Sequence, residues 1–255
     1  MYKFFKRIGL ILLVFVSFIY TEKVTLVVKE YDKLMLDIKE YDRNYKKEMV
    51  EAIIHDNTII PGIAGKKIDI DKSYNKMRFN NKFDENLLEY KLDYPKYRLS
   101  NNIDKYIIGS QKKEVALIIK INKDFDKSIL ETNDKLSFYM NDSFIKNNTL
   151  LVTNLVKCNY TILNNQSYYL KTIIGQEKTF CMTEHMDDSL LKECNNNKSY
   201  TIIPNIIVKN NYYKLNKDLS NGSIVLTDIS NYKNVLKIIK NKGYKLSTIS
   251  ELLSE

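Results

Sequence analysis

The densest group of chemically capable side chains lies in the segment FCMTEHMDDSLLKEC, which carries Glu184, His185, Asp187 and Asp188. An imidazole beside carboxylates can form a general acid–base pair or a weak cation site. A structural interpretation competes with this, because Asp187 or Asp188 could cap a helix that begins at Ser189. We favour the structural interpretation and retain Glu184, His185 and Asp188 as the candidate catalytic residues of this segment.

Two of the three cysteines flank this segment. Cys181 and Cys194 are predicted to form a disulfide, which is typical of a domain exposed to oxidising conditions and would close the loop between them. Cys158 is then the free thiol, and we expect it to be buried at the end of a helix. A nucleophile pair of Cys181 with His185 is a weaker alternative, because no third residue is evident that would orient the histidine.

Residue counts exclude several classes of site. The chain of 255 residues has two His, His55 and His185, together with seven Gly and no Trp. A zinc centre with two or three His ligands would use almost every histidine. The few glycines also leave little room for a Gly-rich phosphate-binding loop. We therefore predict neither a metal ion nor a cofactor.

The net charge of +9 does not by itself indicate a nucleic-acid partner. The lysines are scattered through a sequence rich in Asn, Ile and Tyr, without a long basic run or an Arg-rich helix. A positive charge of this size can equally draw a protein to anionic lipid or to an anionic wall polymer. We predict no nucleic-acid binding.

The N-terminal segment 1–23 is typical of an export signal. Lys3, Lys6 and Arg7 precede an uninterrupted apolar stretch from Ile8 to Tyr20. Because few small residues precede a plausible cleavage point, we favour an uncleaved signal-anchor over a cleaved signal peptide. Basic residues on the N-terminal side keep that end cytoplasmic, which predicts that the rest of the chain lies on the extracytoplasmic side of the membrane.

The next region, residues 24–108, is predicted to hold a long stalk helix and a small α+β region. In segment 24–54 apolar residues recur at three- and four-residue steps between charged ones, which predicts a helix with one apolar stripe. The stripe could pack on its own domain, which we favour, or pair with a partner helix. Asp69, Asp71 and Asp84 could hold a cation, but a solvated strand edge is the simpler interpretation.

Residues 109–255 show the pattern of an α/β domain. Val115–Ile119 is a continuous apolar run, as expected of a buried parallel strand, and a second run covers residues 136–140. Helix-like segments alternate with further strand candidates around residues 200–203 and 223–226. Strands that alternate with helices predict a parallel sheet or barrel.

The sequence here resembles the polysaccharide deacetylase (NodB-homology) family. The tail NGSIVLTDIS…KGYKLSTISELL is similar to the family's GSIILLHD strand followed by a helix and KGYKFVTLSELL. LSFYMN lies where the family has ATFFVNG, and EVALIIKIN lies where it has VALTFDDG. The resemblance covers roughly residues 112–255. It implies a distorted (β/α) barrel that acts on envelope glycans.

The same resemblance implies that the family's catalytic positions are degenerate in this chain. Paired Asp residues of the family supply a base and a metal ligand after the first strand, and Lys120 and Ile121 stand there. The family's two metal-binding His lie in a GHEIGNHTYSH-type loop, which corresponds to CNYTILNNQSY. In this alignment the residues at its histidine positions are Asn159, Asn164 and Tyr168. The family's late-strand general acid corresponds to Thr227 or Asp228.

These departures define the leading hypothesis for function. Metal-dependent amide hydrolysis needs a Lewis acid, a base and an acid for the leaving amine, and the corresponding positions lack all three. We therefore expect a membrane-tethered, extracytoplasmic polysaccharide deacetylase-like protein that is catalytically inactive and binds envelope glycan or a protein partner. Alternatives are an active carbohydrate deacetylase with a non-standard site, for which Asp228 is a further candidate, and a structural protein that acts through its 24–54 helix.

Overall fold

The computed structural model describes residues 11–21, 32–122, 125–166, 168–176 and 178–255. The chain divides into two compact units. One consists of Met1–Glu48 with Gly65–Asp93, and the other of Met49–Ala64 with Tyr94–Glu255. The chain therefore passes between the units three times, which differs from the single boundary that we predicted after residue 108. The reason is that strands near residues 53–60 and 106–107 pair into the sheet of the larger unit.

The smaller unit is a helix pair beside a two-stranded ribbon. Its elements are α2 (Lys33–Tyr45), β3 (Gly65–Ile68), α3 (Ile70–Met77), the 3-10 helix η1 (Glu85–Leu87) and β4 (Tyr90–Asp93). Strands β3 and β4 pair antiparallel, with Gly65 opposite Asp93. The helices and the ribbon share a small core of Leu34, Ile38, Ile68, Met77 and Leu88.

The predicted 24–54 helix is wrong in its extent. Helix α2 ends at Tyr45, and residues 24–31 lie outside the described part of the chain. Downstream of the helix, Ile53–His55 form strand β1, because they pair with Thr58–Ile60 in a hairpin and long-range pairing overrides the helical spacing. The buried residues of α2 are Leu34, Met35 and Ile38, so its apolar stripe faces the core of its own unit.

The structure gives Asp69 and Asp84 capping roles, which speaks against the weaker alternative of a cation site that we considered for Asp69, Asp71 and Asp84. Asp69 accepts a hydrogen bond from the Lys72 backbone as the N-cap of α3, and Asp84 caps η1 in the same way. Within the residues that the structure describes, no three His, Cys, Asp or Glu side chains lie close enough together to hold a metal ion. These aspartates therefore serve the local structure of the chain.

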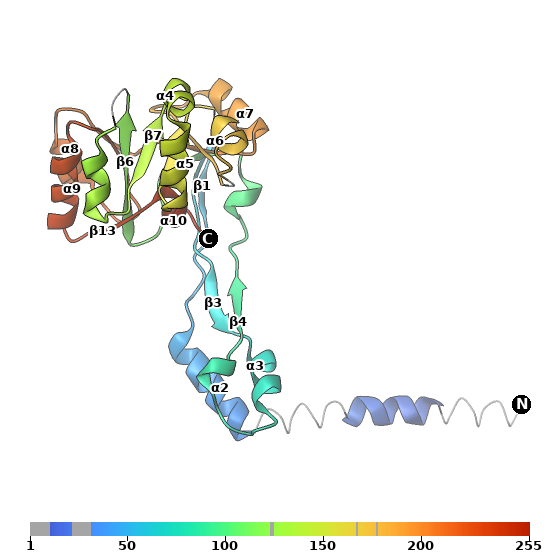
Figure 1. The fold of residues 1–255 in the computed structure, drawn as a ribbon. Helices are drawn as coiled ribbons and strands as arrows, with labels where there is room; N and C mark the ends of the chain where they lie inside the picture. Colours follow the sequence, from blue (N-terminus) through green and yellow to red (C-terminus); the bar gives the residue numbers. More distant parts are fainter. Residues whose placement is uncertain (1–10, 22–31, 123–124, 167, 177) are drawn as a thin grey trace, which may run out of the picture. The chain divides into compact units, whose positions relative to one another are not determined.

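The larger unit is built on one curled, mostly parallel sheet (Figure 1). Its strands are β1 (Ile53–His55), β2 (Thr58–Ile60), β5 (Tyr106–Ile107), β6 (Glu114–Ile121), β7 (Ser137–Met140), β8 (Thr161–Asn164), β9 (Phe180–Met182), β10 (Tyr200–Ile202), β11 (Ile206–Val208), β12 (Ile224–Asp228) and β13 (Lys245–Ser247). They follow the order β1-β2-β5-β10-β9-β8-β7-β6-β12-β11, and β13 pairs with the start of β6. The sheet is thus an open, distorted barrel, which agrees with the fold class predicted from the sequence.

Several helices of this unit cover the outer face of the sheet, and two short ones, η2 (Leu99–Asn101) and α10 (Ile249–Leu252), pack on its inner face. In chain order the other helical segments are η3 (Lys127–Thr132), α4 (Asp142–Asn147), α5 (Thr149–Lys157), α6 (Tyr168–Thr172), α7 (Asp188–Asn196), α8 (Tyr213–Asp218) and α9 (Tyr232–Asn241). Strand β6 shows why both faces are apolar. Leu117 and Ile119 pack outward in a core shared with α4, α5 and α9, whereas Ala116 and Ile118 pack inward.

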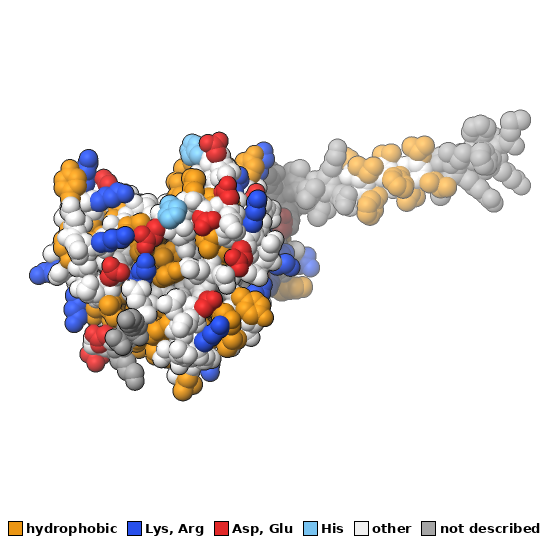
Figure 2. Space-filling model, turned by 90° about the horizontal axis from the view of Figure 1, so that it is seen from above, with side chains coloured by type: hydrophobic (Ala, Val, Ile, Leu, Met, Phe, Trp, Pro, Cys, Tyr) orange, Lys and Arg blue, Asp and Glu red, His pale blue; other side chains and the backbone are white. Residues whose placement is uncertain are grey.

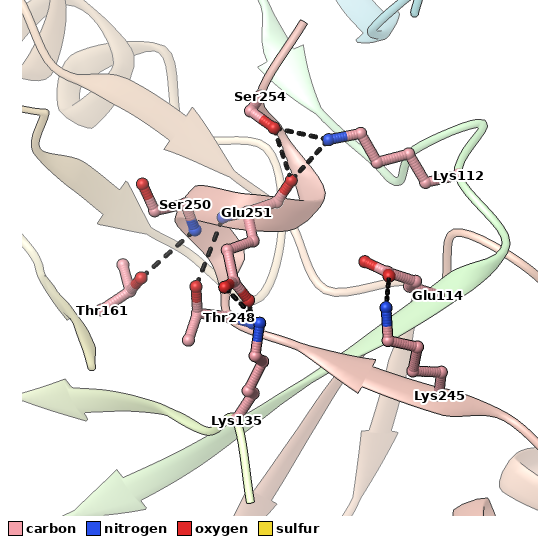
Figure 3. A network of polar contacts seen from close by, with 9 residues as sticks. All are labelled: Lys112, Glu114, Lys135, Thr161, Lys245, Thr248, Ser250, Glu251 and Ser254. Carbon is pink, nitrogen blue, oxygen red and sulfur yellow. Dashed lines mark hydrogen bonds and ion pairs between the residues drawn. The ribbon is translucent and has the colours of Figure 1, made fainter. Parts of the chain in front are cut away.

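Helix α10 closes the amino end of the barrel from inside. Ile249, Leu252 and Leu253 are buried in the inner core. A capping box between Thr248 and Glu251 starts the helix. Figure 3 shows the polar contacts around it: Lys135 pairs with the Glu251 side chain, and Lys112 donates to the Glu251 carbonyl and to Ser254. The end of the chain is therefore an integral part of the barrel.

Residues 11–21 form a helix near the N-terminus. Its exposed side chains are largely apolar, including Leu13 and Phe15. In the part of the chain that the structure describes, no helix combines the length and apolar character required to cross a membrane. The remaining residues of the predicted 1–23 export segment lie outside the described residues.

Candidate functional site

The site follows from the alternation of side chains along the parallel strands. Residues two apart on a strand point to the same face, so each inward apolar column continues to an inward residue at the carboxyl end. On β6 the column Ala116, Ile118 continues to Lys120, and on β12 the column Ile224, Leu226 continues to Asp228. We call the residues in this position the polar rim, which consists of Lys120, Tyr139, Asn165, Glu184, Lys209 and Asp228.

An ion-pair cluster links two sides of the polar rim. Lys120 Nζ lies 3.0 Å from Glu184 Oε1, and Lys209 Nζ lies 3.4 Å from Glu184 Oε2. The two carboxylate oxygens therefore contact different lysines. Strands β6 and β11 flank β12, whereas Glu184 follows β9, three strands from β6 in the sheet order. Glu184 thus reaches across the curled sheet to the two lysines.

The ion pair fixes the charge of both of its partially buried members. Burial alone would lower the pKa of the Lys120 ammonium, but the hydrogen bond and charge of Glu184 outweigh burial and raise that pKa above its ordinary value. The hydrogen bond from Lys120 correspondingly holds the pKa of the Glu184 carboxyl below its ordinary value. Near neutral pH this arrangement favours a charged ammonium and a carboxylate over a neutral amine base or a protonated acid.

Neutral and acidic groups complete the polar rim beside Lys120. Strand pairing places Tyr139 and Asp228 next to Lys120 on its two sides. The Lys120 ammonium lies 5.9 Å from the centroid of the Tyr139 ring, and the Tyr139 hydroxyl donates to Asn165 Oδ1. Figure 2, which looks onto the carboxyl ends of the strands, shows acidic and basic side chains interspersed on this face. The site offers hydrogen-bond donors of both kinds, ammonium and hydroxyl.

The segment that carries the candidate residues Glu184, His185 and Asp188 does not bring them together as an acid–base pair. Glu184 points to the lysines, while His185 and Asp188 are exposed, and no hydrogen bond joins the His185 imidazole to a carboxylate of the described residues. Asp187 accepts hydrogen bonds from the backbone of Ser189 and Leu190 as the N-cap of α7. The structural interpretation of this segment is therefore supported by its geometry.

The disulfide predicted between Cys181 and Cys194 is present and joins β9 to α7. It closes the loop that carries Glu184, and it removes Cys181 as a possible nucleophile beside His185.

The expectation that Cys158 is buried was wrong: this free cysteine is exposed at the carboxyl end of α5. Val152 and Leu155 are the buried residues of α5, whereas Cys158 is its C-cap, where the chain leaves the helix through the left-handed Asn159.

Most of the degenerate family positions face away from the polar rim. Ile121 lies in the core between the sheet and the outer helices. Thr227 is buried, and its hydroxyl donates a hydrogen bond to the Val208 carbonyl. Asn164 is buried and donates to Asp142 at the start of α4. Asn159 precedes β8 in a left-handed conformation, at the opposite end of that strand from Asn164.

The remaining family positions divide in the same way. Tyr168 begins α6 and is exposed, so it also lies off the inner column of β8. Of the two candidates for the late-strand position, Asp228 is the one on the inner face, because Leu226 two residues earlier packs in the inner core. The structure thus brings Lys120, Glu184 and Asp228 together and leaves Ile121, Asn159, Asn164 and Thr227 outside the polar rim.

The residues present do not fit the metal ion that the family resemblance implies. A divalent ion needs several carboxylate, imidazole or thiolate ligands on one side. Here an ammonium from Lys120 takes the position of the first Asp, an outward alkyl group from Ile121 takes the second, and Asn164 is turned toward Asp142. The ammonium would repel a cation at this place.

Three members of the polar rim were not predicted from the sequence: Tyr139, Asn165 and Lys209. Each lies at the end of a strand or just after it. Asn165 and Lys209 lie on the same face of the sheet as the apolar residue two positions earlier, and Tyr139 lies on the same face as Ser137. Ile207 before Lys209 and Leu163 before Asn165 both contact the inner core. Extending every inward column by one step past its last apolar residue would have found Asn165 and Lys209.

Comparison with known proteins places this fold among carbohydrate esterases. No protein-family model matches the chain. The uncharacterised protein YlxY of Bacillus subtilis (strain 168) is 27% identical over 146 residues, which are 54% of this chain and 44% of that relative. The match therefore spans less than half of the length of this curated relative.

Solved structures match over a larger share of the chain. Wild-type BA3943 of Bacillus anthracis, described as a CE4 family pseudoenzyme, has a TM-score of 0.59 at 21% identity and covers 88% of this chain and 96% of its own. A BA3943 mutant described as having restored enzymatic activity has a TM-score of 0.60 at 21% identity, with 88% and 99% covered.

At these identities the likeness establishes the fold. The larger unit has the distorted barrel of the CE4 carbohydrate esterases, the NodB-type polysaccharide deacetylases, which confirms the resemblance seen in the sequence. The structural likeness also extends beyond residues 112–255, the region of the sequence resemblance, because it covers 88% of the chain. The fold is thus that of the polysaccharide deacetylases.

Proposed function

We propose that this polysaccharide deacetylase-like protein does not deacetylate glycans and instead binds an envelope glycan at its polar rim. The observation that carries the proposal is the Lys120–Glu184 ion pair. This pair of opposite charges occupies the place where, by the family resemblance, a carboxylate base and a metal ligand would lie. The description of BA3943 as a CE4 family pseudoenzyme supports the same proposal by analogy of fold.

Acetate release and zinc binding test the absence of catalysis. Purified protein is incubated with N-acetylglucosamine oligomers and with insoluble peptidoglycan, with and without added zinc, and acetate is measured. We expect no acetate above the buffer control, no stoichiometric zinc by calorimetry, and co-sedimentation of the protein with the insoluble glycan. Acetate release that depends on one equivalent of zinc would refute the proposal.

The geometry gives less support to the other functions considered. An active hydrolase built on Glu184, His185 and Asp188 would need these side chains to converge, and only Glu184 reaches the polar rim. A partner protein acting through the 24–54 helix would need a free apolar stripe, and Leu34, Met35 and Ile38 of α2 are buried in its own unit. Glycan binding at the polar rim therefore remains the function that we propose.

We also propose that the protein acts on the extracytoplasmic side of the membrane, tethered through its N-terminal segment. The basic residues and the apolar stretch of segment 1–23 support tethering, and the Cys181–Cys194 disulfide supports an oxidising compartment. Membrane fractionation followed by protease treatment of intact cells tests it. Recovery of the protein in the cytoplasm, protected from protease, would contradict the proposal.

A further inference from the structure

We propose that Lys120 and Lys209 form a cradle for a carboxylate group of the bound glycan, and that Glu184 is an internal carboxylate that occupies this cradle until the ligand displaces it. This inference rests on the glycan binding proposed above and adds the chemical class of the sugar. The cradle is defined by the two ammonium groups, which each contact one oxygen of the same carboxylate.

The cradle and its occupant come from different parts of the sheet. Lys120 ends the inner column of β6, and Lys209 follows β11, and both strands pair with β12. The two lysines therefore lie at the carboxyl ends of the two parallel strands that flank β12. Glu184 lies outside β9, in the segment between that strand and the N-cap of α7 at Asp187. Lys120 is thus held within a strand, whereas Glu184 lies on a connection and Lys209 directly follows its strand.

The contacts of Glu184 are accessible enough to be exchanged. Its side chain is 29% exposed and that of Lys209 is 69% exposed. The contact with Lys209 is open to solvent, and such ion pairs contribute only about 0–1 kcal/mol because water and salt screen them. Lys120 is less exposed, at 31%, but it keeps an anionic partner when a ligand carboxylate takes the place of Glu184. A carboxylate from a ligand that makes the same two contacts can therefore compete with Glu184 at small cost.

Displacement of Glu184 also leaves a charge that selects an anion. Lys120 and Lys209 then carry two positive charges, and Asp228 is the other carboxylate among the six residues of the polar rim. The Tyr139 ring and hydroxyl lie beside Lys120 and can contact the sugar that carries the anion. A neutral sugar would offer no group to replace the Glu184 carboxylate.

Two disaccharides test this inference in the full-length protein. N-acetylglucosamine linked to N-acetylmuramic acid carries a lactyl carboxylate, and di-N-acetylchitobiose is its neutral counterpart. Titration calorimetry should show tighter binding of the first sugar by about fivefold or more, a difference worth about 1 kcal/mol. The preference should weaken as salt is added, because the selected contact is electrostatic.

Variants separate the cradle from its occupant. Glu184→Gln removes the competing carboxylate and should raise the affinity for the acidic disaccharide about fivefold, while the affinity for the neutral one stays unchanged. Lys120→Met with Lys209→Met should abolish the preference. Lys157→Met is the matched control, because Lys157 is exposed at the end of α5 and away from the polar rim. Thermal melts verify that each variant is folded.

The outcomes distinguish failure of the carboxylate cradle from failure of the proposed glycan binding. Equal binding of both sugars, or a Glu184→Gln variant with unchanged or weaker affinity for the acidic sugar, would overturn the cradle while glycan binding stands. Binding of neither sugar by the folded wild-type protein would overturn the cradle. If the insoluble glycan also fails to retain the protein, the proposed glycan binding falls with it.

Discussion

At the scale of single residues, the main feature is a lysine at the end of an inward, apolar column. An ammonium in this position loses hydration, and such a group is stable only when it is paired. Glu184 supplies the partner from across the sheet, at 3.0 Å. The residue at position 120 therefore determines the electrostatics of the site, because its ammonium holds Glu184 as a charged carboxylate.

The first prediction concerns the pH dependence of stability. Lys120 lowers the pKa of Glu184 from its usual 4.5. A carboxyl group with a lowered pKa in the folded state adds stability above its unfolded-state pKa, and this stability is lost as the pH falls through the folded-state value. Thermal melts at about pH 7 and about pH 3.5 should therefore show a larger decrease in Tm for the wild type than for Glu184→Gln.

The comparison between these two proteins isolates Glu184 from the other carboxyl groups. Both proteins lose the contributions of residues such as Glu251, whose pKa is lowered by Lys135 against the opposing effect of its burial. The difference in the decrease in Tm between the wild type and Glu184→Gln therefore reports the contribution of the Glu184 carboxyl group. Equal decreases in the two proteins would show that the ion pair with Lys120 does not form in solution.

At the scale of elements, the sequence predicted the strands well where they are buried on both faces. The run Val115–Ile119 lies inside β6, and the run 136–140 contains β7, because a strand covered on both sides must be apolar at consecutive positions. The same patterns led to the distorted barrel. The face to which each side chain points at the strand ends was harder to predict, because a shift of one residue in the alignment moves a side chain from one face of the sheet to the other.

Positions 227 and 228 illustrate this limit. The sequence resemblance left open which of them corresponds to the late-strand acid, and the pairing of Asp228 with Lys120 places Asp228 on the inner face.

The end of α2 illustrates another limit. Met49, Ala52 and Ile53 continue the helical spacing, but a hairpin that pairs Ile53 with Ile60 ends any helix before them. Pairing between distant residues is not visible in local periodicity.

The second prediction concerns the disulfide that joins β9 to α7. It closes a loop with a sequence separation of 13, for which the chain-entropy model gives about 3 kcal/mol of stabilisation. In a unit of this size such a loss corresponds to a decrease in Tm of about 6–12 °C. Replacing Cys181 and Cys194 by Ser together should produce this decrease in a calorimetric melt.

The exposed Cys158 provides the control for this experiment. Cys158→Ser should leave the Tm within about 1–2 °C of the wild type, because exposed side chains contribute little to stability. The double substitution is then made in the Cys158→Ser background, which also prevents thiol exchange. A double variant as stable as its parent would mean that the bridge does not constrain the loop that carries Glu184.

At the scale of the whole larger unit, the two ends of the barrel have opposite characters. The carboxyl end carries the polar rim, with charges that are partly open to solvent. The amino end is filled by α10, whose Ser250 amide hydrogen bonds to Thr161 and whose Ile249 amide hydrogen bonds to Ser137 (Figure 3 shows the first). The packing of α10 at the amino end therefore holds the sheet closed without contributions from the charged side chains at the carboxyl end.

The third prediction tests this dependence on α10. Leu252 is fully buried in the inner core, where it meets residues from several strands. Leu252→Ala removes apolar contacts and leaves a cavity, which costs about 2–5 kcal/mol in well-packed cores. Leu150→Ala in α5 is the matched control, because Leu150 is 77% exposed and should change stability by no more than about 0.5 kcal/mol. Urea unfolding curves measure both changes, and equal midpoints for the two variants would show that α10 does not hold the barrel together.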